Sequence, residues 1–478
     1  MSRSSPPAQP SSDGGSSTPH VGGGGSSSSS SRKMIAVTAT VGAAASLVAA
    51  GLFLIYGDAG GGAAREGDKP RAEESGRQGR TLFKVRSPKV TGGADSMDVV
   101  GSWVTDGSYA RGTGETVVGM DPGSGERKWE LPLDGRICHS SERASASGKA
   151  AVVVAESRSS GSACDQLVVF DVDSGKKEWQ QELPNGGGSS AYETEVAVSR
   201  EVVAATWEYG SAAYSLSGGS PLWKHDLDDE GDCTNEDLSG GEVLTVVVKC
   251  GYSDDLRVRK LNPGTGTSSW ESKLPGDAET GQVVSSDPVV VAVDTDPGTG
   301  VRTDVMSVGE DGKLTTISLG KEKYVLDPCQ LYAESCPASV VDDDFLYVPS
   351  LAQGDGDGAQ NEITAFDLRT GKLAWKSGAG KHRVIVPLRM EDGELIAYRL
   401  PAPGSGGEVV AIDPAAHGKK QEVLLRNPKA GAALESAFVR PREARILYED
   451  GRLFLQQGAV PKSPDPHQKY VSAVFGAG

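Results

Sequence analysis

The sequence predicts an all-β protein whose main domain is a β-propeller of four-stranded antiparallel blades. Three observations lead to this fold class. A Gly followed four residues later by a Trp occurs in five copies of one turn motif. These copies and two degenerate ones recur at intervals of 44 to 54 residues, the spacing of a propeller blade. From Arg80 onward, short apolar strand patterns alternate with polar turns and show no helical period.

The chain begins with segments that do not belong to the propeller. Residues 1–33 consist largely of Ser, Gly and Pro and are predicted to be a disordered tail. Residues 34–56 carry no charge and would form a helix about 34 Å long, enough to cross a membrane. Residues 57–79, rich in Gly and charged residues, are predicted to be a flexible linker, and residues 80–478 the propeller.

The charges around the apolar stretch predict its orientation. Arg32 and Lys33 precede it and Asp58 follows it, so the positive-inside rule places the tail in the cytoplasm. We therefore predict a single-pass protein of the cell membrane with an extracellular propeller. A signal peptide cleaved near residues 59–64 is the alternative that the sequence leaves open.

The repeated motif is clearest at residues 365–375, AFDLRTGKLAW. An apolar strand ends at Asp367, whose side chain can bond the backbone of the turn, and Gly371 accepts a positive φ. The Trp then lies in the next strand, where one hairpin cannot bury it, so neighbouring copies must share the ring. The predicted docking residues are Trp129, Trp179, Trp223, Trp270 and Trp375, and the turn glycines are Gly125, Gly175, Gly219, Gly266 and Gly371.

Counting the copies predicts the number of blades. One degenerate copy, at residues 314–326, keeps the strand and Gly320 but lacks the Asp and the Trp, and another keeps Asp413 with one extra residue before Gly418. After these seven turns the remaining C-terminal strands lack an outer partner, which residues 81–87 can supply. We predict an eight-bladed ring closed by this N-terminal strand, because closure protects exposed sheet edges. Seven blades is the alternative.

The Asp-x-x-Thr/Ser-Gly-x-x-x-Trp turn resembles the tryptophan-docking repeat of the PQQ-like β-propellers. This superfamily contains the quinoprotein alcohol dehydrogenases and the outer-membrane assembly scaffold lipoprotein BamB. The resemblance extends from about Arg80 to the C-terminus. It implies the propeller fold, but the members it covers include enzymes, scaffolds and sensor domains.

All six Cys residues lie beyond the predicted membrane span, in a compartment where disulfides persist. Three of them follow a repeat motif by nine or ten residues and so occupy equivalent places. This shared phase predicts short staples between consecutive blades. The predicted pairs are Cys138 with Cys164, Cys233 with Cys250, and Cys329 with Cys336. A zinc site is not favoured, because no C-x-x-C pair is present.

An enzymatic role can be tested against the residues that the resemblance implies. Quinoprotein dehydrogenases resemble one another in a vicinal Cys-Cys disulfide above the quinone, a Trp beneath it, and acidic and amide calcium ligands. This chain has neither adjacent Cys residues nor a C-x-x-C-H haem motif. Trp103 and Trp207 lie outside the repeat motif in strand patterns, and we expect both in the core. PQQ is therefore not an expected cofactor.

Metal binding and nucleophilic catalysis are not indicated either. Residues 294–300 and 354–358 gather carboxylates, but neither segment has the spacing of an EF-hand loop, so calcium is not expected. None of the six His residues lies in a nucleophile motif, and each is expected at the surface or in a loop. They are His20, His139, His225, His382, His417 and His467. We predict no catalytic, cofactor-binding or metal-binding residue.

The formal net charge of −17 argues against nucleic acid and anionic lipid surfaces as partners. Propeller faces gather loops from every blade and form broad docking surfaces. The sequence therefore predicts a non-enzymatic extracytoplasmic propeller, tethered to the membrane, that acts as a scaffold or binding module for a protein or cell-envelope ligand. One alternative is an oxidoreductase that uses PQQ or another cofactor. A second is a BamB-like assembly or secretion accessory.

Overall fold

The fold was analysed in a computed structural model, in which the compact unit that concerns us comprises Arg71–Gly478. The structure describes residues 76–90, 95–159, 161–184, 194–226, 233–251, 255–295, 304–320, 323–324, 339–354, 356–438, 444–463 and 469–477. The predicted tail, the predicted membrane span and most of the predicted linker lie outside these residues. None of the helices that the structure does describe is long and apolar enough to cross a membrane.

Within the described residues, six separate four-stranded sheets follow one another along the chain. The first three comprise β3 (Ser102–Val104), β4 (Tyr109–Thr113), β5 (Thr116–Met120) and β6 (Arg127–Pro132); β7 (Ile137–Ser140), β8 (Lys149–Ala155), β9 (Cys164–Asp171) and β10 (Lys177–Glu182); and β11 (Glu195–Ser199), β12 (Val202–Trp207), β13 (Gly210–Ser215) and β14 (Pro221–Asp226). The next three comprise β15 (Cys233–Ser239), β16 (Leu244–Cys250), β17 (Asp255–Leu261) and β18 (Ser268–Lys273); β19 (Thr280–Ser286), β20 (Val289–Asp294), β21 (Asp304–Val308) and β22 (Leu314–Ser318); and β23 (Val340–Val341), β24 (Phe345–Pro349), β25 (Glu362–Asp367) and β26 (Leu373–Gly378).

The last sheet has eight strands and brings the two ends of the unit together. One half comprises β27 (Ile385–Glu391), β28 (Glu394–Arg399), β29 (Glu408–Ile412) and β30 (Gln421–Arg426). The other half comprises β31 (Ala444–Glu449), β32 (Arg452–Gln457), β34 (Tyr470–Ala477) and β1 (Arg77–Arg86). The first two residues of β1 pair with β30 in parallel, and the rest of β1 pairs with β34 antiparallel. The N-terminal strand thus lies beside the C-terminal one, as expected for residues 81–87.

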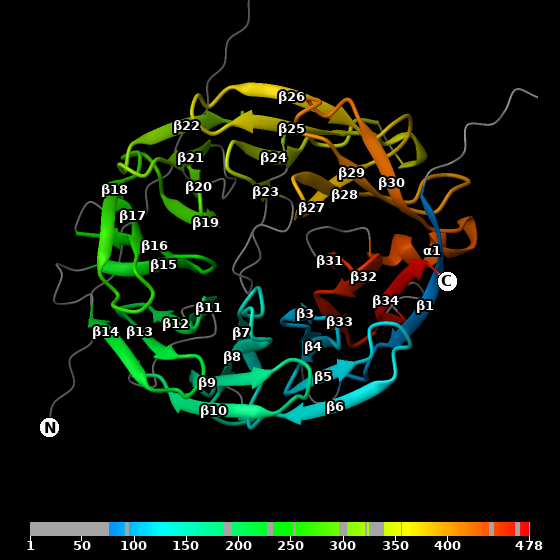
Figure 1. The fold of residues 1–478 in the computed structure, drawn as a ribbon. Coiled ribbons are helices and arrows are strands. Elements are labelled where there is room, and N and C mark those ends of the chain that lie inside the picture. The colour runs from blue at the N-terminus through cyan, green and yellow to red at the C-terminus, as the bar shows by residue number, and fades with distance from the viewer. Residues whose placement is uncertain are drawn as a thin grey trace, which may run out of the picture. The chain divides into compact units, whose positions relative to one another are not determined.

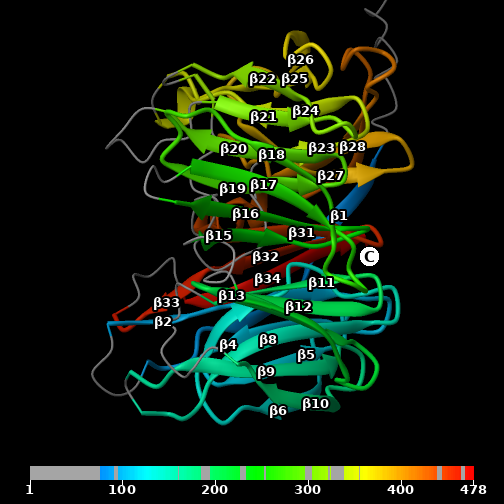
Figure 2. The same cartoon turned by 90° about the vertical axis from the view of Figure 1, so that its left-hand side faces the viewer.

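The sheets succeed one another around a ring, with the first strand of each sheet nearest the centre (Figure 1). β2 (Ser96–Asp98) and β33 (Ala459–Pro461) form a separate two-stranded sheet, which Figure 2 shows at the edge of the unit. The helical segments are short. They are α1 (Ala432–Glu435) with the flanking 3-10 turns η3 (Lys429–Gly431) and η4 (Ser436–Phe438), and η2 (Gly356–Gly358). The described residues therefore have the predicted all-β architecture of four-stranded antiparallel sheets.

The sequence pattern of each strand follows from its place in the sheet. A middle strand is covered on both faces by neighbouring sheets, so all six residues of β12 are buried and nearly all are apolar. An outer strand such as β14 alternates exposed and half-buried residues because one face remains in water. The hydrophobic clusters consequently lie between successive sheets. One of them combines Trp103 of the first sheet with Val152 and Phe170 of the second.

The predicted turn chemistry is present in the structure. At residues 367–371, the Gly371 N–H donates to the Asp367 carbonyl at 2.9 Å. The Asp367 carboxylate accepts the N–H groups of Arg369 at 3.0 Å and Thr370 at 2.8 Å. Partial burial acts to raise the pKa of Asp367, but these hydrogen bonds outweigh it and hold the pKa below its usual value. Asp121, Asp171 and Asn262 make equivalent contacts in their own turns.

Four of the five predicted tryptophan rings lie against a turn glycine of the next sheet, whereas Trp270 approaches Gly312 only with its Cβ, at 4.0 Å. Gly175 has a φ of 68°, and a Cβ added to it would come within 2.3 Å of the Trp129 ring. Trp375 covers Gly418 in the same way. At the junction of the two chain ends, Phe83 of β1 takes this place over Gly125. Two further rings donate their indole N–H to a carbonyl of the next turn, Trp179 to Leu216 at 2.9 Å and Trp223 to Pro263 at 2.7 Å.

One degenerate turn was predicted at the wrong glycine. The turn between β21 and β22 contains Gly312, with a φ of 76°, whereas Gly320 follows the end of β22. The Gly309 N–H donates to the Lys313 carbonyl, so this loop is one residue shorter than the loops of the regular copies. The shortened loop removes the Asp-to-Gly spacing by which the other turns were found. Strand β22 also lacks an aromatic residue, and the backbone carbonyl of Thr316 lies against Gly371 where the other sheets have a ring.

The structure contains two of the predicted disulfides, Cys138–Cys164 and Cys233–Cys250. Each disulfide joins two strands of a single sheet, so the prediction that the disulfides join consecutive blades was wrong. Cys138 already belongs to β7, the first strand of the sheet that contains Cys164, and Cys233 pairs directly with Cys250 across β15 and β16. Cys138 and Cys233 share a spacing from the preceding repeat motif, and this spacing was taken to place them in the connection between two sheets. The connection ends before each of them, and both already belong to the first strand of the next sheet. Cys329 and Cys336 lie outside the described residues.

Candidate functional site

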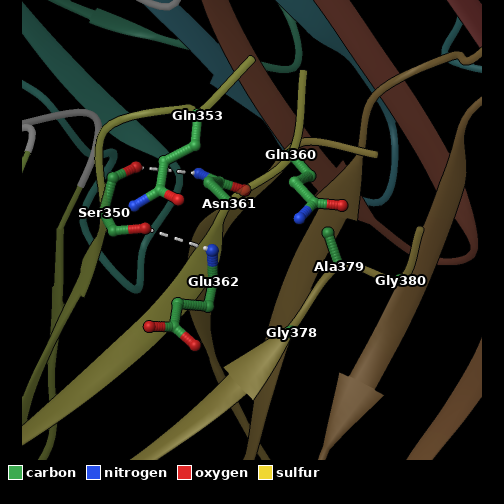
Figure 3. A pocket seen from close by; sticks show the side chains of 8 residues that line it. All are labelled: Ser350, Gln353, Gln360, Asn361, Glu362, Gly378, Ala379 and Gly380. Atoms are coloured by element: carbon green, nitrogen blue, oxygen red, sulfur yellow. Dashed lines mark hydrogen bonds between the residues drawn. The ribbon is translucent and has the colours of Figure 1, made fainter. Parts of the chain in front are cut away.

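A polar pocket of about 390 Å³ lies at one end of the sheet β23–β26 (Figure 3). β24 ends there, β25 begins there, and β26 ends there before the chain crosses to β27. The pocket is therefore built by the loop between β24 and β25 and by the connection between two sheets. Its lining residues are Ser350, Gln353, Gln360, Asn361, Glu362, Gly378, Ala379 and Gly380.

Asn361 forms the wall of the pocket and is fully engaged in holding it. Its side-chain amide N–H donates to the carbonyls of Ser350 and Ile385, each at 3.1 Å. Its side-chain oxygen accepts the Ile385 N–H at 2.7 Å. The Glu362 N–H donates to the Ser350 hydroxyl oxygen at 3.2 Å, and both Ser350 contacts are visible in Figure 3. These bonds join the ends of β24, β25 and β27, so the wall is rigid.

The side chains available to a ligand are two amides and a carboxylate. The backbones of Gln353 and Gln360 exchange two hydrogen bonds, at 2.8 and 2.9 Å, which pin the loop that carries both amides. The Glu362 carboxylate pairs with the Lys376 ammonium. This hydrogen bond raises the pKa of Lys376, so the ammonium stays charged at neutral pH. The pocket therefore offers both donors and acceptors of hydrogen bonds in fixed positions.

The connection beside the pocket is held by a buried cluster around Glu408, which is 7% exposed. Its carboxylate forms ion pairs with Arg383 at 2.9 Å, Arg399 at 3.0 Å and Arg426 at 2.9 Å. The Arg383 carbonyl also accepts the Asn361 N–H at 3.2 Å. The residues between β26 and β27 are thus tied both to the pocket wall and to the neighbouring sheet.

A second buried carboxylate holds the adjacent loop between β28 and β29. Glu435, 1% exposed, accepts the Tyr398 hydroxyl at 2.6 Å, the Gly407 N–H at 3.1 Å and the Asn427 amide at 2.8 Å. Burial, followed by the nearby Glu435 carboxylate, raises the pKa of Tyr398 well above its ordinary value. The phenol therefore remains a donor. This end of the two sheets is stabilised by polar networks, which fix loop positions more specifically than apolar contacts do.

The chemistry that these groups can perform is recognition. In the portions of the chain that the structure covers, no three His, Cys, Asp or Glu side chains are grouped to hold a metal ion. The pocket lining contains no His or Cys and only one carboxyl group. Fixed amides and one paired carboxylate suit hydrogen bonding to a polar ligand.

None of the predicted docking tryptophans or turn glycines lines this pocket. Trp103 and Trp207 are 2% and 5% exposed and pack in the core, as expected. The pocket amides were not predicted. A signal was available, because the loop between β24 and β25 spans residues 350–361, while the corresponding strands β4 and β5 are joined by only two residues. Long loops in a compact domain are frequently functional.

His139 was expected at the surface or in a loop, and this was wrong. It lies in β7, the first strand of its sheet, and is 2% exposed. Its Nδ1 atom accepts the Val196 N–H at 3.3 Å, and burial lowers the pKa of the imidazole to about 4. The neighbouring Cys138 was assigned to a connection, and that shifted the expected start of the strand. Of the two acidic segments considered for calcium, residues 296–300 and Asp355 lie outside the described residues.

Comparison with known proteins gives a family match and a set of similar structures. The family profile described as outer membrane protein assembly factor BamB matches residues 75–243, 164–324 and 254–459. BamB from Moraxella catarrhalis is similar at 13% identity and a TM-score of 0.43, over 82% of this chain and 100% of that chain. Quinohemoprotein alcohol dehydrogenase from Comamonas testosteroni is similar at 12% identity and a TM-score of 0.46, over 84% and 76% of the two chains. Among curated proteins, no match was found.

Proposed function

Since the chain belongs to the BamB family of PQQ-like β-propellers, we propose that it is a non-enzymatic binding scaffold for a protein or cell-envelope ligand. The observation that carries this proposal is the amide-lined pocket, whose wall and flanking loops are held by Asn361, Glu408 and Glu435. A pre-formed polar site loses little conformational freedom when a ligand binds, which favours recognition. A BamB-like role in assembly or secretion is the specific form of this function that the family suggests.

The rigidity of such a scaffold would come from a closed ring of eight blades. The pairing of β1 with β34 supports this arrangement, because β1 supplies the fourth strand of the last set. Phe83 over Gly125 supports it as well, because it repeats at this junction the contact that tryptophans make elsewhere. Closing the ring leaves no sheet face without a neighbour.

The proposed place of action is outside the cytoplasm, with residues 34–56 as a single membrane anchor and the N-terminus inside. The two disulfides support export of the propeller, since such bonds persist in oxidising compartments. Protease treatment of intact cells tests this topology. A protected N-terminal tag together with a digested C-terminal tag is the expected result, and protection of both tags would contradict it.

We propose that the scaffold works without PQQ or calcium. Purified full-length chain incubated with PQQ and calcium should show no quinone absorbance after desalting and no dye reduction with alcohols or sugars. Bound quinone with turnover would replace the scaffold proposal by an oxidoreductase.

A photo-crosslinking amino acid placed at position 353 tests the site itself. Gln353 lies in the pocket, while Leu222 on β14 is 41% exposed and serves as the matched control position away from it. We expect an adduct in living cells from position 353 and none from position 222, and we expect Gln360→Ala to reduce it. Equal adducts from both positions, or an adduct that survives loss of the pocket amide, would exclude this pocket as the docking site.

A further inference from the structure

The seam between the first sheet and the strands β31, β32, β34 and β1 joins the beginning and the end of the propeller. Part of this seam is apolar, with Tyr109, Phe454 and Val474 buried in one cluster. The rings of Tyr109 and Phe454 lie 5.0 Å apart between centroids. Next to this apolar layer is a polar layer.

On the side of the first sheet, the polar layer consists of Arg111 and Ser102. Arg111 stands two residues after Tyr109 in β4, so both side chains leave the same face of the sheet. Ser102 is the direct partner of Arg111 across β3 and β4, and cross-strand partners share a face. Both side chains therefore face the last sheet.

On the opposite side, the layer consists of Gln456 and Ser472. Gln456 stands two residues after Phe454 in β32, and Ser472 two residues before Val474 in β34. They are direct cross-strand partners, so they face the first sheet together. The Tyr109 hydroxyl donates to the Gln456 side-chain oxygen at 2.9 Å, which shows that the two polar rows meet.

This layer has more hydrogen-bond donors than acceptors. Arg111 is 6% exposed and makes no ion pair within the described residues, and its only hydrogen bond there runs from Nη1 to the Thr113 hydroxyl at 2.6 Å. The Nε atom of Arg111 and the hydroxyls of Ser102 and Ser472 are buried without a partner of hydrogen-bond geometry. Both hydroxyls lie beside the Tyr109 phenol.

An unneutralised guanidinium in such a place is costly, because burial removes its hydration and supplies no opposite charge. The nearby side chains are amide, phenol and hydroxyl groups together with the Arg445 guanidinium, which is the cross-strand partner of Gln456 and lies close to Tyr109. None of these groups is an anion at neutral pH. An anion between the two rows would accept hydrogen bonds from the guanidinium and the two hydroxyls. Tyr109 and Ser472 are fully buried, so a ligand that reaches them has to be a single small ion.

We propose that the seam binds one small inorganic anion of the size of chloride, held by Arg111, Ser102 and Ser472. The ion neutralises the buried guanidinium and links the first sheet to the last. This inference does not depend on the pocket ligand. It assigns the ion a structural role at the junction where β1 brings the chain ends together.

Anion exchange at constant ionic strength tests the proposal with purified full-length chain. Sodium chloride replaces sodium gluconate, whose anion is too large for the site, and urea unfolding is followed by tryptophan fluorescence. We expect a saturable rise in the unfolding midpoint. A chloride concentration ten times the dissociation constant favours the folded state about 11-fold. No difference between the two salts would overturn the proposal.

Variants localise the effect. Arg111→Met should abolish the chloride dependence, while Arg127→Met, which alters a 66% exposed arginine of the same sheet, should keep it. If Arg111→Met does not fold, Ser102→Ala and Ser472→Ala should each weaken the dependence. Crystals grown in sodium bromide should show an anomalous peak bounded by Arg111, Ser102 and Ser472. Bromide only at other positions, water at this position, or unchanged dependence in the variants would refute the site.

Discussion

The buried imidazole of His139 should make the folded state sensitive to mild acid. In the unfolded chain a histidine binds its proton near pH 6.5, whereas burial lowers the pKa of His139 in the folded state to about 4. Between these values the unfolded state binds more protons. As far as His139 is concerned, the free energy of unfolding is therefore at its full value above about pH 6.5 and falls as the pH drops toward 4. The two pKa values correspond to a loss of roughly 2 kcal/mol by pH 5 and roughly 3 kcal/mol by pH 4.

The assay compares urea unfolding of the wild type and of His139→Gln at pH 8, 6.5 and 5. Glutamine keeps an acceptor for the Val196 N–H but cannot titrate, so the variant should lose less stability on acidification by roughly 2 kcal/mol at pH 5. His382→Asn is the control, since His382 is exposed with a φ of 57° that asparagine tolerates. The reasoning is refuted if His139→Gln follows the wild-type pH dependence, or if the control variant flattens it equally.

Three further predictions concern the repeat motif, each measured by urea unfolding. Trp375→Ala removes a ring that is 6% exposed and should cost about 3–5 kcal/mol, whereas Leu373→Ala on the same strand, 47% exposed, should cost less than about 1 kcal/mol; similar losses would contradict ring docking. Gly175→Ala should destabilise the fold because its φ is 68° and its Cβ would meet a tryptophan ring at 2.3 Å, while Gly218→Ala, with nothing within 4 Å, should be nearly neutral. Asp367→Ala should cost about 1 kcal/mol at pH 7, and Asp367→Asn should keep most of that stability. Because hydrogen bonding lowers the pKa of Asp367, its carboxylate stabilises the fold above about pH 4, and this contribution is lost as the pH falls below that value. Asp367→Asn should remove this acid-dependent loss of stability. If the variant loses as much stability below about pH 4 as the wild type, the Asp367 carboxylate is not its source.

The features that could be predicted from the sequence depend on groups close together in the chain. The Asp367 turn needs only the next four residues, and its hydrogen bonds are formed as expected. Cys233 and Cys250 are 17 residues apart on consecutive strands, so their pairing also follows from local order. The strand at residues 81–87 was identified because the last set of strands lacked one member.

The errors arose where local spacing changed. A loop shortened by one residue moved the turn from Gly320 to Gly312, because a three-residue loop also places a glycine at positive φ. His139 was misplaced because its strand begins immediately after the connection between sheets. The pocket amides could not be grouped, because the pocket also requires Gly378 and Gly380 from beyond the next strand.

The sequence by itself determined the repeating turn, the strand order within each copy, and the rings that neighbouring copies share. These properties follow from backbone torsions and side-chain alternation over about ten residues. Only the tertiary structure brought Tyr109 into contact with Gln456, which stands 347 residues later in the chain. Such a meeting depends on the register of β32 and β34 and on the face that each strand turns toward its neighbour. A one-residue change of register would turn these side chains to the other face, and no local pattern excludes it.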